Sequence, residues 1–126
     1  MKLRIKGDSL RLRLTKGEVS QLTESGVVEE RVRFGAGADL VYRLRRDAAA
    51  RDISASFAQG VVDVRLPDKS ARDWAGSNEV TLAGNQSLGA TDELRIVVEK
   101  DFACLAPREG EDESDHFANP TVGKAC

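Results

Sequence analysis

Residues 2–14 read KLRIKGDSLRLRL, and this stretch decides the fold class of the chain. Apolar and basic residues alternate on both sides of Gly7-Asp8, which is the period of a strand with one buried face. A two-residue connection at this point pairs Ile5 with Leu10 on the apolar face. The stretch therefore predicts a β-hairpin with one aliphatic face and one basic face.

A short helix and a second hairpin are expected after this stretch. Thr15 and Glu18 have the spacing of a capping box, and Ser25-Gly26 supplies a stop, so a helix is predicted over residues 16–25. Apolar residues then alternate on both sides of a glycine-rich turn at residues 35–38. Together these elements make one ββαββ unit.

The pattern of this unit recurs when the sequence is shifted by 52 residues without a gap. The shift superposes Arg13 on Arg65. It also superposes Leu44 on Ile96 and predicts a second helix near residues 68–76. The alternative is that two amphipathic stretches look alike without being copies, because aliphatic residues interchange freely. We favour the repeat, since turns, helix and strands all fall at matching positions.

The expected architecture is mainly β with two short helices, an α+β fold in a single domain of 126 residues. A tandem ββαββ repeat makes up most of this domain. Its first unit is expected at residues 1–50 and its second at 51–102. An irregular acidic tail is expected at residues 103–126.

Composition narrows the class of protein. The chain is 40% hydrophobic and 32% charged, which is typical of a globular protein and excludes disorder throughout. No apolar run approaches the ~18 residues of a membrane span, and the opening residues do not form a signal peptide. We therefore expect a cytoplasmic protein with no membrane partner. Its two cysteines are then expected to be reduced.

Residues 6–10 (KGDSL) and 13–16 (RLTK) resemble a known class of protein. They are similar to the swapped-hairpin DNA-binding domains of AbrB and MazE transcription factors and antitoxins. Asp8 and Thr15 stand where that class usually has asparagine and proline. Residues 64–68 (VRLPD) look like the second half of the same pattern. The resemblance implies that ββαββ units interlock into one AbrB-like swapped-hairpin barrel, here within one chain, and that the partner is nucleic acid.

The whole chain is also similar to a small family of uncharacterised bacterial proteins. The similarity lies in residues 1–7 (MKLRIKG) near one end and residues 99–105 (EKDFACL) near the other. It implies no activity.

The basic face of the first hairpin is the first candidate site. Residues 1–65 carry 13 Lys and Arg against 9 Asp and Glu, although the whole chain has a formal charge of −2. Clustered cations of this kind are typical of contact with a phosphate backbone. The alternative is a face neutralised within the chain by Glu29, Glu30, Glu99 or Asp101. The candidate residues for binding an anion or nucleic acid are Lys6, Arg11, Arg13 and Lys16.

The acidic tail is the second candidate site, because it gathers side chains that bind zinc or a related divalent metal. The candidate ligands are Cys104, Asp115, His116 and Cys126. The alternatives for the two cysteines are a disulfide or unrelated thiols.

Catalysis has little support, since the chain contains one histidine and no paired base and nucleophile. The leading expectation is a non-enzymatic binding or interaction module of AbrB-like type, a monomer or homodimer, whose partner is nucleic acid or a protein. The acidic tail then either docks on the basic hairpin or is presented to a protein partner. A metal-binding protein that uses the tail is the alternative.

Overall fold

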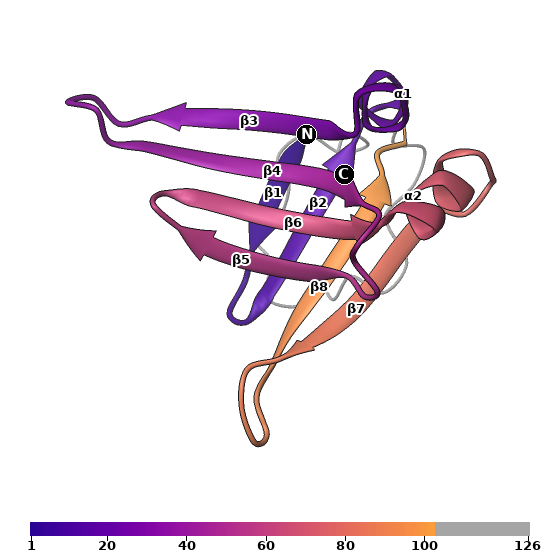
Figure 1. The fold of residues 1–126 in the computed structure, drawn as a ribbon. Coiled ribbons are helices and arrows are strands. Elements are labelled where there is room, and N and C mark those ends of the chain that lie inside the picture. The colour runs from indigo at the N-terminus through magenta and orange to yellow at the C-terminus, as the bar shows by residue number, and fades with distance from the viewer. Residues whose placement is uncertain (103–126) are drawn as a thin grey trace, which may run out of the picture.

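The structure is a computed structural model, and it describes residues 1–102. Two strands, a helix and two further strands follow one another along the chain, and this ββαββ order occurs twice (Figure 1). The first half contains β1 (Lys2–Ile5), β2 (Ser9–Leu14), α1 (Lys16–Ser25), β3 (Val27–Arg33) and β4 (Asp39–Asp47). The second half contains β5 (Ser54–Ala58), β6 (Val61–Pro67), α2 (Asp68–Ala75), β7 (Thr81–Ser87) and β8 (Glu93–Lys100).

The first hairpin forms with the predicted register. Ile5 lies opposite Leu10, and Arg4 lies opposite Arg11 on the other face. Both predicted helices are also confirmed. The first has the predicted bounds, and the second ends one residue before the predicted end, at Ala75. Within residues 1–102, no helix is long and apolar enough to cross a membrane.

Local sequence explains where α1 begins and ends. The Thr15 hydroxyl accepts a hydrogen bond from the Glu18 N–H at 3.3 Å, and the Glu18 carboxylate accepts one from the Thr15 N–H at 2.9 Å. This is the predicted capping box. Gly26 ends the helix at φ 83°, a backbone conformation that residues with a Cβ rarely adopt. The Gly26 N–H donates to the Leu22 carbonyl at 3.0 Å.

The eight strands of the described residues form two four-stranded sheets, and each sheet takes one hairpin from each half of the chain. Sheet A has the order β1-β2-β8-β7, and sheet B has the order β3-β4-β6-β5. The inner strands pair in parallel, β2 with β8 and β4 with β6, whereas each hairpin is antiparallel. Figure 1 shows the two sheets crossing, with both helices at the end where β2 and β6 finish. The mainly β, α+β class is therefore confirmed.

Neither sheet closes into a barrel, so the predicted AbrB-like swapped-hairpin barrel is not confirmed. Within residues 1–102, no backbone ladder joins β1 to β3 or β5 to β7. At the second of these corners a side chain takes the place of the ladder. The Gln86 amide on β7 accepts from the Ala55 N–H on β5 at 2.6 Å and donates to the Ala55 carbonyl at 2.9 Å.

The core lies between the sheets and beneath the helices. Trp74 of α2 is its largest fully buried side chain, and the indole N–H donates to the Val80 carbonyl at 3.0 Å. This bond satisfies the polar end of a side chain that is otherwise surrounded by aliphatic groups. The buried core consists of Met1, Leu12, Leu14, Val19, Leu22, Val28, Leu44, Val62, Val64, Leu66, Ala71, Trp74, Ile96 and Val98.

The two halves are related by a repeat whose spacing changes once. From β5 to α2 the spacing is the predicted 52 residues. In the last hairpin it is 54 residues, as two equivalent hydrogen bonds show. The Arg46 N–H donates to the Gly26 carbonyl, and the Lys100 N–H donates to the Val80 carbonyl, both at 3.0 Å. The predicted ungapped shift is therefore wrong beyond α2.

The connection after each helix causes this change. The first helix passes into β3 through Gly26 alone, whereas α2 is followed by residues 76–80 before β7 begins. Leu44 therefore corresponds to Val98, and not to Ile96 as predicted. Figure 1 shows the longer connection beside α2.

The first residue closes the corner between β1 and β3. The Met1 side chain is fully buried, and the Met1 ammonium donates hydrogen bonds to the carboxylates of Glu18 and Glu30. The Met1 carbonyl accepts a hydrogen bond from the Tyr42 hydroxyl at 3.1 Å. One residue thus joins α1, β3 and β4.

Contacts at this corner shift two pKa values in opposite directions. Burial lowers the pKa of the Met1 ammonium, but hydrogen bonds to Glu18 and Glu30 outweigh it and hold this pKa above its ordinary value. Burial raises the pKa of Glu18, but hydrogen bonds from the ammonium and from Thr15 outweigh it and hold this pKa below its ordinary value.

We expect this ion pair to stabilise the chain over a window of pH. The ammonium contributes fully below its unfolded pKa of about 8, and its contribution is lost as pH rises through the raised folded value. Glu18 contributes fully above its unfolded pKa of about 4.3, and its contribution is lost as pH falls through the lowered folded value. Urea unfolding at a series of pH values measures both limbs. The same chain acetylated at Met1 is the control, and it should be less stable at neutral pH and lose the alkaline limb. A stability difference between the two chains that stays constant through alkaline pH would contradict this account.

Candidate functional site

The outer face of sheet A carries the predicted anion-binding arginines of the first hairpin. The leucines of β2 point into the core, so Arg11 and Arg13 lie on the opposite face. Parallel pairing with β8 places Val97 beside Arg11 and Glu99 beside Arg13. The second half of the chain therefore supplies the neighbours of these two arginines.

Glu99 brings Arg11 and Arg13 together. This carboxylate is only 7% exposed, and its Oε1 accepts from the Arg13 Nε at 2.6 Å while its Oε2 lies 3.5 Å from an Arg11 Nη1. Lys2 similarly pairs with Asp101 at 3.2 Å. Two of the four acids proposed to neutralise the basic face therefore do contact it.

Lys6 and Lys16 lie at opposite ends of β2. Lys6 lies at the turn before β2, where its N–H donates to the Ser9 carbonyl at 3.1 Å, and Lys16 opens α1 beyond the other end of the strand. Six residues of β2 separate them, a length of about 20 Å. The four predicted residues thus do not form one site.

Four cations gather near the β1–β2 turn, and Arg11 is the one among them that pairs with a described acid. Arg4 lies opposite Arg11, and Arg95 of β8 lies beside Ser9 on the other side of β2. Within residues 1–102, no carboxylate pairs with Arg4, Lys6 or Arg95, although Arg95 donates to the Asn85 side chain at 3.4 Å. We call Arg4, Lys6, Arg11 and Arg95 the turn cluster. The sequence-based prediction missed Arg95, because only the pairing of β2 with β8 brings it to this face.

Sheet B has a related arrangement with the charges placed differently. Asp63 on β6 is 7% exposed and lies between two arginines. It accepts from the Arg45 Nη2 at 2.8 Å and from the Arg65 Nε at 3.3 Å. Arg65 corresponds to Arg13, as predicted, but the buried acid lies on the last strand of the second half in sheet A and on the second strand of the same half in sheet B. Further pairs on this face are Arg31 with Asp39 at 2.9 Å and Arg43 with Glu29 at 2.7 Å.

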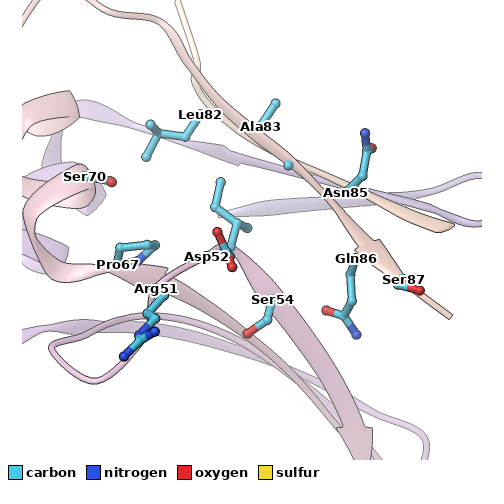
Figure 2. A pocket seen from close by; sticks show the side chains of 12 residues that line it. Arg51, Asp52, Ser54, Pro67, Ser70, Leu82, Ala83, Asn85, Gln86 and Ser87 are labelled. Atoms are coloured by element: carbon cyan, nitrogen blue, oxygen red, sulfur yellow. The ribbon is translucent and has the colours of Figure 1, made fainter.

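A cleft with both polar and apolar lining lies at the corner between β5 and β7. Its volume is about 530 Å³, and it is bounded by residues 51–54, the start of α2 and residues 82–87. Figure 2 shows Ser54, Ser70 and Gln86 around the opening, with Leu82 reaching toward the helix. The Arg51 and Asp52 side chains are exposed and make no hydrogen bond or ion pair within the described residues. No sequence motif had indicated this cleft.

The proposed zinc ligands fall outside the part of the chain that the structure describes. Cys104, Asp115, His116 and Cys126 all belong to residues 103–126. Within residues 1–102, no group of three or more His, Cys, Asp and Glu side chains is placed to hold a metal ion.

Comparison with known protein families gives a match over most of the chain. The model of a family described as a family of unknown function, DUF7009, matches residues 1–121. No curated protein matches the chain. No solved structure matches it either.

Proposed function

The chain belongs to the DUF7009 family of unknown function, and we propose that it is a non-enzymatic, AbrB-like binding module for nucleic acid. The observation that carries this proposal is the turn cluster on the outer face of sheet A. Its cations come from β1, the first turn, β2 and β8, so both halves of the chain contribute to it.

The pairing of strands supports the AbrB-like part of the proposal. A swapped-hairpin barrel requires each sheet to combine hairpins from two ββαββ units. Both sheets of this chain do so through their parallel inner strands. At the two corners, where no backbone ladder is formed among the described residues, hydrogen bonds of Met1 and Gln86 connect neighbouring elements.

The charges of the turn cluster favour an anionic partner. Arg4 and Arg11 lie directly opposite each other, a like-charge pair that costs free energy unless an anion lies nearby. Glu99 offsets the charge of Arg11 in part, but no described acid does so for Arg4 or Arg95. Arginine also binds two oxygens of one phosphate at a time, so a phosphate backbone matches both the charge and the geometry.

Removing two arginines of the turn cluster should weaken binding and its dependence on salt. If the four cations contact phosphates, affinity for a DNA duplex should fall about 100-fold between 50 and 200 mM salt, and only about 10-fold for the Arg4→Ala/Arg95→Ala variant. Fluorescence anisotropy with a labelled duplex measures both. The matched control is Arg31→Ala/Arg33→Ala on β3 of sheet B, which removes the same charge and should keep the wild-type salt dependence.

The same measurement on a chain ending at residue 102 tests whether the acidic tail covers the turn cluster. Residues 103–126 carry five acids against Arg108 and Lys124, so their removal should raise affinity by roughly tenfold at low salt. If neither the full chain nor the shortened one binds DNA in a salt-dependent way, both the nucleic-acid function and the covering tail are wrong. Equal losses in the two arginine variants would also count against the turn cluster.

A further inference from the structure

The cleft between β5 and β7 is the counterpart of the corner that holds Met1. In the first half, Glu18 of α1 and Glu30 of β3 bind the Met1 ammonium. The repeat spacing of 52 residues takes Glu18 to Ser70, and the spacing of 54 residues takes Glu30 to Gly84. Both of these residues border the cleft.

The cleft is open because two large acidic side chains have become small. Ile53 stands in the place of Met1, and the chain continues before it, so no ammonium needs a partner there. Gly84 also suits the close approach of the strands, since an added Cβ would lie 3.4 Å from the Cβ of Ile53. The space that carboxylates fill at the first corner is therefore accessible at the second.

The side chains at the cleft offer one charge of each sign. Arg51 and Asp52 are consecutive, exposed and without partners among the described residues. Ser54 and Ser70 add hydroxyl groups, and Leu82 adds an apolar surface (Figure 2). The Gln86 amide is already engaged by the backbone of β5, so recognition depends on the other groups.

We infer that the cleft binds a small apolar amino acid in its zwitterionic form. Arg51 binds the ligand carboxylate, Asp52 binds the ligand ammonium, and the ligand side chain lies against Leu82. At the first corner Met1 places an ammonium group beside an apolar side chain, and Glu18 and Glu30 bind that ammonium. At the second corner Asp52 is the carboxylate that lines the cleft. The volume of about 530 Å³ is within the range of small-molecule sites. This site is separate from the turn cluster and does not depend on nucleic-acid binding.

Amide NMR titration of the full chain with L-leucine tests this inference. We expect saturable shifts confined to residues 51–54, 70 and 82–87, with a Kd of about 1–10 mM, as befits so small a ligand. N-acetyl-leucine lacks the ammonium and leucinamide lacks the carboxylate, so each should bind at least about tenfold more weakly. Absence of saturable shifts, or equal binding of all three compounds, would overturn the inference.

Variants locate the two charges. Asp52→Asn should abolish the preference for leucine over N-acetyl-leucine. Arg51→Gln should abolish the preference for leucine over leucinamide. The matched controls Asp92→Asn and Arg33→Gln change exposed residues that do not line the cleft and should bind leucine as the wild type does. If the controls lose binding to the same extent, the site is not the cleft. The Arg51 and Asp52 variants should leave the salt dependence of DNA binding unchanged, so this inference and the proposed function fail separately.

Discussion

Division of the chain between residues 50 and 51 is expected to abolish folding of either fragment alone. Each half contains two hairpins that belong to different sheets, and β2 and β4 find their parallel partners only in the other half. A hairpin without further strands is marginally stable at best. We therefore expect fragments 1–50 and 51–126 to show no cooperative thermal transition separately, and an equimolar mixture to recover one.

Circular dichroism during thermal melting measures this result, and sedimentation of each fragment reveals any self-association. The intact chain of residues 1–126 is the reference with which the recovered transition is compared. A cooperative transition from either fragment as a monomer would show that one half contains a complete core. The observed exchange of hairpins would then be unnecessary for stability.

Replacement of Trp74 by alanine should have the largest effect of any single substitution. The side chain is completely buried, its N–H satisfies the Val80 carbonyl, and the Lys100 ammonium lies 5.4 Å from its ring. Alanine removes the ring and leaves a cavity, for an expected loss of about 3–5 kcal/mol in the free energy of unfolding. That is a large part of the stability of an ordinary domain.

Urea unfolding measures this loss, and two other variants separate its causes. Trp74→Phe keeps most of the apolar volume but removes the N–H, so it should cost only about 0.5–1.5 kcal/mol, because the Val80 carbonyl loses one donor and keeps the Lys100 N–H. The equivalent residue of α1 is Leu22, which is also buried, and Leu22→Ala should cost about 2–5 kcal/mol. A loss below about 1 kcal/mol for Trp74→Ala would mean that this part of the core repacks readily.

Local patterns predicted the local structure of this chain well. Alternation in residues 2–14 gave the register of the first hairpin, and the capping box at Thr15 gave the start of α1. Both depend on residues close together in the chain. Long-range pairing is different, because nothing in the pattern of β2 indicates that Glu99 rather than Glu29 or Glu30 lies beside its arginines.

The error in the repeat spacing also arises because a local pattern does not specify which strands pair. Two extra residues between the start of α2 and the start of β7 leave the alternation of apolar residues unchanged, because the period of a strand is two. Leu44 therefore matched Ile96 as well as it would match Val98. The cleft was missed for a further reason: its walls come from three separate segments that meet only where the edges of the two sheets come together.

The unequal placement of the two buried carboxylates has a consequence for self-recognition. If the first half paired with a copy of itself, the observed register would place Arg11 beside Arg43 and Arg13 beside Arg45, since β4 would take the place of β8. No buried acid would separate these side chains. Repulsion between these arginines would disfavour the pairing of two first halves. The second half instead supplies Glu99, which pairs with Arg11 and Arg13. The charges on the parallel inner strands therefore favour pairing between the two unlike halves of the chain.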